Sequence, residues 1–389
     1  MNPEKILLVY SNTGAGHKSA AEAIKHAIFE LCEKNSSEQP EIIMQDIVEE
    51  SNSINRLFAH MYNRLLKNRQ DWMKYYISLI EWVKPNESNI GYKLSCAYTK
   101  RLITEINPSI VVSVHPMVNH FLARTLKDLG LSDKVKLLTV LTDPNANLWT
   151  GWACPDADLL IAPNDLAANK LVSFGIAPER IQVVGMPIQP VFLKPACVTR
   201  QELLTEYRLD PQQLTIVVTA GSAGGGNMPK IYKELAAVKR PFQVIFICGK
   251  NNRLKTKMDK LAKEMHFKTK VLRYASSMPE IMSSCDLLVT KAGGLTTFEA
   301  IARRLPMVLD LITRPMPQES GTATMLIETG LAKAVLKPED IVPIVEAAEV
   351  ILDKDSMPLP TVHNIHRTDA VYDIAEIILR ACREKTPVN

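Results

Sequence analysis

A glycine-rich turn near the start of the chain carries a histidine suited to acid–base chemistry. Gly14 and Gly16 stand between an expected strand and an expected helix, and His17 follows directly. Glycines let the backbone approach a ligand, and the free N–H groups of the next helix attract an anion. A helix N-terminus also lowers the pKa of a nearby imidazole, which keeps it neutral and able to accept a proton. His17 is therefore a candidate general base, and a histidine that only hydrogen-bonds its loop is the alternative.

Two further glycine turns occur in the second half of the chain. The first begins at Gly221 and Ser222 and holds four glycines in six residues after an expected strand. Such a turn suits close backbone contact with a phosphate, and a flexible turn without a ligand is the alternative. In the second, TKAGGLTTFEA at 290–300, Gly293 and Gly294 separate a strand from a helix whose N-terminus favours an anion. The turn before His17 matches neither GxGxxG nor GxxxxGKS/T, so neither NAD nor ATP binding is predicted from it.

Glu299 lies one turn into the helix that follows Gly294. A carboxylate at this position can accept hydrogen bonds from both hydroxyls of a ribose. Thr296 and Glu299 also have the spacing of a capping box, which would give Glu299 a structural role instead. The same spacing at Ser19 and Glu22 predicts a capping box for a helix that begins near Ser19.

Apolar runs of strand length alternate with longer helical stretches along the whole chain, which predicts parallel sheets covered by helices. The pattern restarts once, so we expect two Rossmann-like α/β domains at 1–190 and 214–389, joined by a proline-containing linker at 191–213. The last helix is expected to pack back on the first domain. Ligands in such folds bind at the carboxyl ends of strands, here in a cleft that both domains face. The expected strands are Ile6–Tyr10, Ile42–Ile47, Ile110–Val114, Val135–Leu141, Leu159–Ala162, Gln182–Val184, Thr215–Ala220, Phe242–Cys248, Thr269–Tyr274, Asp286–Thr290, Met307–Leu311 and Ala332–Leu336.

The segment Ser51–Arg101 departs from this alternation. It holds nine Lys and Arg against three Asp and Glu, and eight of the chain's 23 aromatic residues. Its apolar side chains recur at helical spacing, which predicts an amphipathic helix. Such a helix either packs its apolar stripe on the sheet or lies in the interface of an anionic bilayer. The residues expected to contact a membrane are Arg64, Lys67, Arg69, Trp72, Lys74, Tyr76 and Trp82.

The composition is that of a globular protein with enough apolar material for two cores: 46% of the 389 residues are hydrophobic and 23% are charged. Seven scattered cysteines without a CxxC pair favour a reducing compartment and argue against a zinc ribbon. Neither a signal peptide nor a membrane-spanning run of about eighteen apolar residues is recognised. We therefore expect a soluble or peripheral protein, and the net charge of +4 says little about its partners.

Several motifs together resemble glycosyltransferase family 28. Within it the resemblance is closest to monogalactosyldiacylglycerol synthases and bacterial diacylglycerol glucosyltransferases, and it covers nearly the whole chain. A more distant relative is the N-acetylglucosaminyltransferase that completes the lipid-linked peptidoglycan precursor. The motifs are GAGHKSAAEAI at 14–24, VHP at 114–116, TDPN at 142–145, VVGMPI at 183–188, ICGKN at 247–251 and TKAGGLTTFEAIARRLPMVL at 290–309.

The resemblance implies the glycosyltransferase B-type fold, with a UDP-sugar held mainly by the C-terminal domain. It assigns Gly293, Gly294 and Thr296 to the diphosphate, Glu299 to the ribose and Arg273 to the uracil region. Gly221 and Ser222 match the family's first glycine loop in that domain, and His17 matches a histidine regarded as the base or as a residue that orients the acceptor. It also assigns Ser51–Arg101 to membrane docking and acceptor binding.

One segment departs from the family pattern. Where family members usually read PxPGQExxN, the chain reads PMPQESGT at 315–322, without the glycine and with Thr322 in place of asparagine. Gln318 and Glu319 are expected to keep their contacts with sugar hydroxyls, while the identity of the sugar stays open. UDP-glucose, UDP-galactose and UDP-N-acetylglucosamine are the candidate donors.

The chemistry implied is an inverting displacement in which a lipid hydroxyl attacks the anomeric carbon and UDP leaves. Diacylglycerol is the expected acceptor. No DxD motif stands at the end of an expected strand, so we expect no metal and no cofactor, with helix N-termini and backbone amides meeting the charge on the β-phosphate. His17 is the expected proton acceptor, with Asp143 or His115 as its partner or substitute.

Two rival functions stay open at this point. One is a UDP-sugar 2-epimerase, which shares the two-domain architecture; the other is a lipid-binding or regulatory relative that has lost catalysis. The partners expected are a UDP-sugar, a lipid acceptor and an anionic membrane surface, and no nucleic acid. The expected location is cytoplasmic, peripheral on the inner face of the cell membrane.

Overall fold

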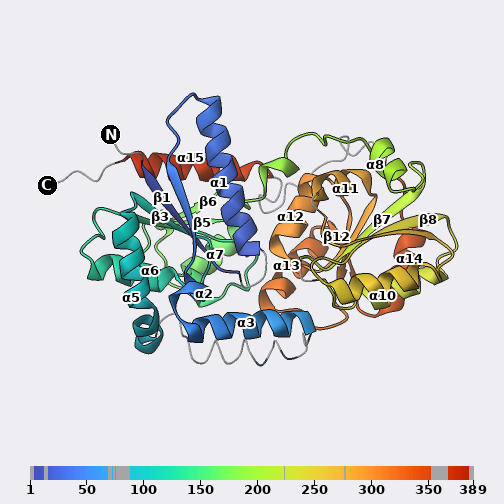
Figure 1. Ribbon diagram of the computed structural model, residues 1–389, viewed down its shortest axis with the longest axis horizontal. Coiled ribbons are helices and arrows are strands. Elements are labelled where there is room, and N and C mark those ends of the chain that lie inside the picture. The colour runs from blue at the N-terminus through green and yellow to red at the C-terminus, as the bar shows by residue number, and fades with distance from the viewer. Residues whose placement is uncertain are drawn as a thin grey trace. The chain divides into compact units, whose positions relative to one another are not determined.

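The protein divides into two compact α/β units (Figure 1). The computed structural model describes residues 4–12, 16–68, 72, 75, 88–222, 224–275, 277–351 and 367–384. The first unit comprises Met1–Arg64, Trp72–Pro190 and His363–Asn389, and the second comprises Leu65–Asp71 and Val191–Val362. Among the described residues, no helix is both long enough and apolar enough to cross a membrane.

The first unit is built on a parallel sheet of six strands in the order β2-β1-β3-β4-β5-β6. The central strands are buried on both faces, as parallel sheets covered by helices require. In register, Leu8 of β1 lies between Met44 of β2 and Val112 of β3. The strands are β1 (Lys5–Tyr10), β2 (Glu41–Asp46), β3 (Ile110–Ser113), β4 (Lys136–Val140), β5 (Leu159–Ala162) and β6 (Ile181–Val183).

Helices cover both faces of this sheet. Leu7 and Val9 of β1 belong to a core shared with α5, α6 and α7, while the alternating residues Ile6 and Leu8 point to the opposite face. The C-terminal helix α15 contacts α1, β3 and β4, and it crosses α1 in the view of Figure 1. The helices are α1 (Gly16–Lys34), α2 (Ile47–Ser51), α3 (Ser53–Asn68), α5 (Asn89–Ile106), α6 (Asn119–Asp128), α7 (Asp165–Ser173) and α15 (Ala370–Arg383).

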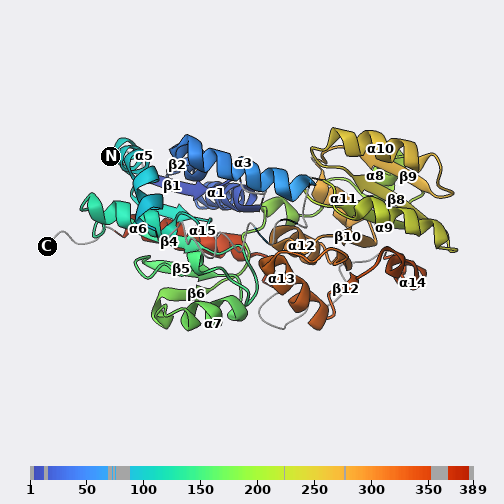
Figure 2. The same cartoon turned by 90° about the horizontal axis from the view of Figure 1, so that it is seen from below.

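The second unit repeats the plan with a parallel sheet in the order β12-β11-β10-β7-β8-β9. Its core on one face joins alternate strand residues to α9, α10 and α14, and Figure 2 views the unit from this side. Helices α8 and α11 pack together on the other face, on the opposite side of the strands in Figure 1. The elements are β7 (Leu214–Thr219), β8 (Phe242–Ile247), β9 (Lys268–Leu272), β10 (Leu287–Thr290), β11 (Met307–Asp310), β12 (Ala332–Val335), α8 (Arg200–Glu206), α9 (Met228–Glu234), α10 (Asn252–Ala262), α11 (Met278–Ser284), α12 (Gly294–Ala302), α13 (Pro317–Glu328) and α14 (Ile341–Glu346).

All twelve predicted strands are present, with ends that differ by at most two residues. The two predicted capping boxes are wrong. Helix α1 begins at Gly16 and α12 at Gly294, so Ser19 and Thr296 lie inside helices rather than at their N-caps. Glu22 instead lies 3.9 Å from the Lys18 ammonium one turn away. A capping box does form at α8, where Thr199 and Glu202 bond each other's backbone N–H.

Candidate active site

His17 stands in the first turn of α1, beside the residues that follow β3 and β4. Its Nδ1 lies 2.8 Å from the Val114 carbonyl oxygen and 3.1 Å from the Thr142 hydroxyl. Because a carbonyl oxygen only accepts hydrogen bonds, Nδ1 carries the ring proton in the neutral tautomer. The lone pair is therefore on Nε2. The tertiary contacts give His17 the tautomer that a general base needs.

His115 and Asp143, the two predicted alternatives, lie in the same cluster as His17. The His115 ring is edge-on to the His17 ring, with centroids 4.3 Å apart, and its Nδ1 accepts the Met117 N–H at 3.2 Å. The Asp143 carboxylate accepts the indole N–H of Trp152 at 2.7 Å. The carboxyl ends of β1, β3 and β4 thus bring together all three residues that were predicted from positions far apart in the chain.

Burial sets the protonation states of this cluster. It lowers the pKa of His17, and the nearby Asp143 carboxylate opposes that shift. Burial also lowers the pKa of His115 well below its ordinary value. It raises the pKa of Asp143, and the charge of His17 opposes this rise. The imidazole of His17 is therefore neutral at neutral pH, in the form that accepts a proton.

Two members of the cluster were missed in the sequence. Trp152 is fully buried in a short 3-10 helix (Thr150–Trp152), and Thr142 belongs to the TDPN motif that had been noted without a role for its hydroxyl. The motif was a signal for Thr142, but nothing in the local sequence links Trp152 to Asp143. Gly14 lies outside the described residues, and Gly16 is the first residue of α1.

In the second unit, the glycine loop after β7 packs against the loop after β8. Gly224 and Gly249 have positive φ, and a Cβ on Gly224 would lie 1.9 Å from the Cys248 carbonyl oxygen. A Cβ on Gly249 would likewise meet the Ser222 carbonyl oxygen at 2.4 Å, and the Lys250 N–H donates to that oxygen at 2.8 Å. These two glycines allow the loops to approach, whereas the Cβ direction of Gly221 is open.

Helix α12 presents an uncapped N-terminus. Its N-cap is Gly293, which has no side chain to bond the first N–H groups, and the space around a Cβ at Gly293 is open. Thr297 turns its hydroxyl inward to the Gly293 and Gly294 carbonyl oxygens, at 3.0 Å each. The first N–H groups of α12 are therefore left without a side-chain cap, and such groups can bind an anion.

Two charged residues flank this turn. Burial raises the pKa of the Glu299 carboxyl to about 7, and no hydrogen bond or ion pair of its carboxylate is found within the described part of the chain. Lys291 immediately precedes the turn, and burial lowers its pKa against the opposing influence of Glu319 and Asp310. Lys291 was not predicted from the sequence, because a single lysine in a turn forms no recognisable motif.

The remaining predicted donor residues also follow the carboxyl ends of strands in this unit. Gln318 and Glu319 lie in the first turn of α13, after β11, and Arg273 is exposed just after β9. Both carboxylate oxygens of Asp310, at the end of β11, lie 3.2 Å from Nδ2 of Asn227, which also donates to the Thr313 hydroxyl at 3.0 Å. Parallel α/β sheets bind ligands at this edge.

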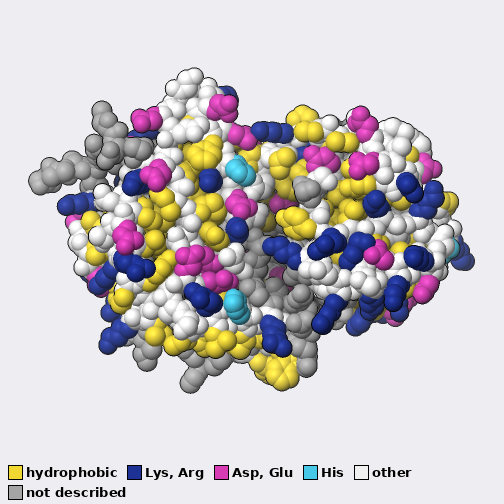
Figure 3. Space-filling model, in the orientation of Figure 1, with side chains coloured by type: hydrophobic (Ala, Val, Ile, Leu, Met, Phe, Trp, Pro, Cys, Tyr) yellow, Lys and Arg dark blue, Asp and Glu magenta, His cyan; other side chains and the backbone are white. Residues whose placement is uncertain are grey.

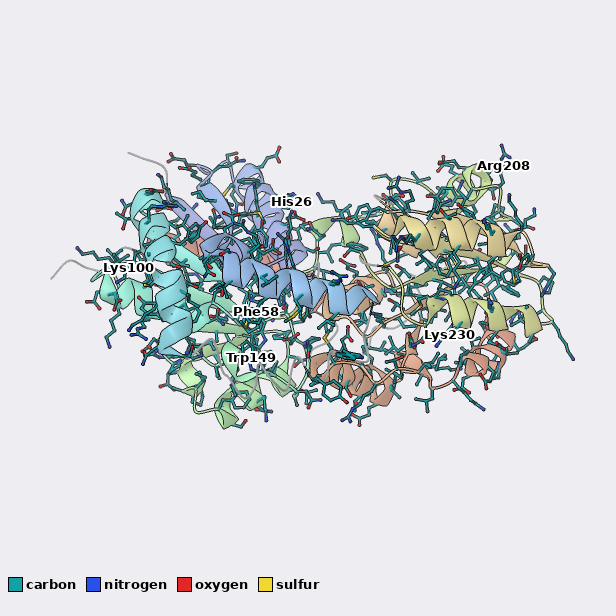
Figure 4. All side chains as sticks on the ribbon, turned by 60° about the horizontal axis from the view of Figure 1, so that its bottom comes forward. His26, Phe58, Lys100, Trp149, Arg208 and Lys230 are labelled. Atoms are coloured by element: carbon teal, nitrogen blue, oxygen red, sulfur yellow. The ribbon has the colours of Figure 1, made fainter. Side chains whose placement is uncertain are left out.

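The apolar stripe of α3 is exposed rather than packed on the sheet. Leu57 is 68% exposed, Ile54 47%, Phe58 43% and Met61 38%. Hydrophobic side chains are visible along this helix in Figure 3, and Figure 4 labels Phe58 on it. Trp72 is also half exposed, and Arg64 lies near the end of α3. The predicted membrane residues Arg69, Lys74, Tyr76 and Trp82, and the side chain of Lys67, lie outside what the structure describes.

Both halves of the chain match known families. Residues 17–188 match the family described as monogalactosyldiacylglycerol (MGDG) synthase, and residues 215–319 match the glycosyltransferase family 28 C-terminal domain. The chain belongs to glycosyltransferase family 28. The first match begins at His17, and the second contains the Gly221 loop and ends at Glu319.

Among curated proteins, this family 28 chain is similar to plant MGDG synthases. It is 28% identical to the chloroplastic enzyme of Spinacia oleracea over 351 residues, which are 87% of this chain and 65% of that protein. It is 26% identical to MGDG synthase 2 of Arabidopsis thaliana, over 99% of this chain and 82% of that protein. The chain thus spans slightly less than two thirds of the first relatives, 65% and 64% of their lengths.

Solved structures show that the family 28 chain has the glycosyltransferase B-type fold. MurG of Acinetobacter baumannii aligns with a TM-score of 0.56 at 14% identity, covering 97% of this chain and all of that one (100%). The UDP-GlcNAc 2-epimerase of Neisseria meningitidis, solved with UDP-GlcNAc, aligns with a TM-score of 0.61 at 15% identity and the same coverage, 97% and 100%. At these identities the likeness shows the fold alone.

Proposed function

We propose that this family 28 chain is an inverting glycosyltransferase that moves a hexose from a UDP-sugar to a membrane lipid, with diacylglycerol as the acceptor. The observation that carries the proposal is His17: its Nδ1 bonds the Val114 carbonyl oxygen, and its Nε2 is left as the basic nitrogen. This base lies in the half of the chain that matches MGDG synthases, whose names state a diacylglycerol product.

In the proposed reaction the acceptor hydroxyl gives its proton to Nε2 of His17 as its oxygen attacks the anomeric carbon. The bond from that carbon to the β-phosphate oxygen breaks on the opposite face, and UDP leaves with the electron pair. Asp143 stabilises the imidazolium that forms, because a nearby carboxylate favours the charged ring. Trp152 holds that carboxylate in place through its indole N–H.

We assign the leaving-group charge to the second unit. The uncapped N-terminus of α12 at Gly293 and Gly294 binds the diphosphate, and Lys291 adds a positive charge beside it. Glu299 accepts the ribose hydroxyls with a carboxylate that has no competing protein partner in the described residues. Arg273, Gln318 and Glu319 contact the uracil region and the sugar. In this proposal amides and lysine replace a metal ion and no cofactor takes part.

We also propose that α3 brings the enzyme to its acceptor. Four large apolar side chains are exposed on one helix, and burying them in a bilayer interface would remove that apolar area from water. Arg64 and the other basic residues of Ser51–Arg101 would favour an anionic surface. The enzyme would then act as a peripheral protein on the cytoplasmic face of the cell membrane.

A donor panel tests the proposed function. The protein is incubated with dispersed diacylglycerol and UDP-glucose, UDP-galactose or UDP-N-acetylglucosamine. The lipid products are then identified from their masses by mass spectrometry. A hexosyl-diacylglycerol from one donor, lost in His17→Ala, is the expected result. Interconversion of UDP-sugars without a lipid product would assign the chain to epimerisation, the activity named for the structural relative with TM-score 0.61. Donor binding without any product would indicate a relative that has lost catalysis.

A further inference from the structure

In addition to Ser51–Arg101, one stretch of the second unit carries a large excess of positive charge. Residues 228–270, which run from the start of α9 to the middle of β9, hold twelve Lys and Arg against three Asp and Glu. The whole chain has a formal net charge of only +4, so the rest of the molecule is net negative. Charge of one sign confined to a single region raises the local concentration of oppositely charged partners.

The two helices of this stretch present their basic residues on the same side of the unit. Both α9 and α10 bury their apolar stripes against one face of the sheet, through Ile231 on α9 and Leu254 and Met258 on α10. Their outward surfaces therefore face the same way. On α10 the exposed residues Arg253, Lys257 and Lys260 recur at the i, i+4 and i+7 spacing of one helix face.

We call this surface the basic face. Lys and Arg side chains gather over α10 in Figure 3, and Figure 4 labels Lys230 on α9. Its exposed members, none of which forms an ion pair with another described residue, are Lys230, Lys233, Lys239, Lys250, Arg253, Lys257, Lys260, Lys263 and Lys268. The ion pair on α10 joins a different lysine, Lys255, to Asp259 at 2.6 Å.

The basic face has a definite edge. Beyond α9 it ends at α14, where Glu346 accepts the Lys239 backbone N–H at 2.6 Å. At the other end, the backbone of Lys250 bonds Ser222 of the glycine loop, so the basic face reaches the carboxyl edge of the sheet. None of these basic side chains has been given a part in the proposed donor site.

We propose that the basic face docks the second unit on the surface of a bilayer that contains anionic phospholipid. Eight of its nine members are lysines, which attract a fluid array of phosphate groups as point charges without needing a set geometry. Surfaces that bind single-stranded nucleic acid add exposed aromatic side chains that stack on bases. Here α10 has no aromatic residue, and the aromatic residue of α9, Tyr232, is fully buried.

This contact differs in kind from that of α3. The α3 stripe is apolar and depends on insertion, whereas the basic face has no exposed large apolar side chain on α9 or α10 and depends on charge. Salt therefore distinguishes them, because ions screen surface charges over about 10 Å at 0.1 M. The inference rests on the proposed function only in its choice of a lipid surface, and its test needs no sugar transfer.

Flotation with vesicles tests the inference directly. The full chain is compared with Arg253→Gln/Lys257→Gln/Lys260→Gln on vesicles of phosphatidylcholine alone and of phosphatidylcholine mixed equally with phosphatidylglycerol. Each basic residue close to an anionic membrane contributes about fivefold to partitioning, so the triple variant should bind the mixed vesicles about 100-fold more weakly at low salt. The difference should disappear in phosphatidylcholine vesicles and at high salt.

A matched control removes the same charge elsewhere. Lys34, Lys127 and Lys134 are exposed lysines of the first unit, and their triple glutamine variant should bind mixed vesicles much as the unchanged protein does. Equal loss in both triple variants would overturn the inference, because net charge rather than the basic face would then account for binding. The same melting temperature in both variants excludes misfolding as the cause.

Two further outcomes separate the inference from the proposed function. Sugar transfer to detergent-dispersed diacylglycerol together with unchanged vesicle binding by the Arg253 triple variant would overturn the inference alone. Vesicle binding that depends on the basic face, in a protein without transfer activity, would support the inference and overturn the function. Loss of binding to a single-stranded oligonucleotide, with vesicle binding intact, would assign the basic face to nucleic acid instead.

Discussion

In the sequence, β1 and β10 are each followed by glycines and then by a helix, α1 or α12. The candidate side chains near the starts of these two helices are nevertheless held differently. The functional side chain of the first, His17, is held by Val114 and Thr142 from two other strand ends. In the second, the carboxylate of Glu299 has no protein partner in the described residues, and the Gly293 N-terminus is uncapped.

In the proposed reaction, this difference separates a base that must be oriented from donor-binding groups that must be left available. A general base needs one tautomer and one direction, so protein contacts use its other nitrogen. A ligand-binding carboxylate or helix terminus gains most when the ligand supplies the bonds that the protein omits. Burial shifts both titrating groups toward their neutral forms, lowering the pKa of His17 and raising that of Glu299 to about 7.

The largest effect of a substitution is expected at His17, the oriented base of the proposed reaction. His17→Ala should lower kcat by about 10²–10⁴, the usual contribution of a positioned general base, while UDP affinity measured by calorimetry changes little. His17→Gln keeps a hydrogen-bonding side chain that cannot take a proton, so it should be as slow as the alanine variant. A glutamine variant with most of the wild-type rate would mean that His17 only orients the acceptor, and Asp143 would become the candidate base.

A smaller effect is expected at Glu299, the carboxylate left available for the donor. Glu299→Ala should raise the donor KM about tenfold or more, because charge-assisted hydrogen bonds to the ribose contribute about 1.5–3 kcal/mol each. The melting temperature should not fall, since Glu299 is not part of a capping box and its buried carboxylate costs stability when it ionises.

Glu202→Ala is the matched control, because Glu202 belongs to a capping box in the same unit. It should lower stability by about 1 kcal/mol and leave the donor KM unchanged. If Glu299→Ala instead lowers stability and leaves the donor KM unchanged, Glu299 has a structural role and does not bind the donor.

Stability as a function of pH should also report on Glu299. Its folded pKa of about 7 lies above the unfolded value, so the folded state binds the extra proton. This contribution is fully present below the unfolded pKa and is lost as pH rises through about 7.

Relative to Glu299→Gln, the unchanged protein should therefore lose about 3 kcal/mol of unfolding free energy between about pH 4.5 and pH 7, measured by urea denaturation without donor. His17 has the opposite sign: its lowered pKa favours the folded state above the unfolded value and costs stability as pH falls. A difference between wild type and Glu299→Gln that does not change with pH would contradict the raised pKa.

The smallest effect is expected on vesicle binding, from a substitution on α3. Leu57→Ser on α3 should weaken vesicle binding about fivefold, because one exposed leucine is no longer buried in the interface. Turnover with a short-chain, water-soluble acceptor and UDP affinity should stay unchanged. A fall in either would mean that α3 supports the chemistry of one of the two turns directly.

Much of the fold was predictable because it is written in local patterns. Apolar runs of strand length located all twelve strands, and glycines after strands located both turns. The capping boxes failed because Ser-x-x-Glu and Thr-x-x-Glu spacings also occur inside helices, and only the path of the chain decides where a helix begins. Likewise, the amphipathic pattern of α3 identified an apolar stripe but not whether protein covers it.

Residue order alone was enough to name His17, His115, Asp143, Gly293 and Glu299 as candidates, because each belongs to a short motif whose chemistry is local. Only the folded structure decided which contacts their side chains make. The tautomer of His17 depends on a carbonyl 97 positions away, and the role of Trp152 depends on the Asp143 carboxylate. Hydrogen bonds and desolvation act over a few ångströms in space, whereas sequence patterns report only on neighbours along the chain.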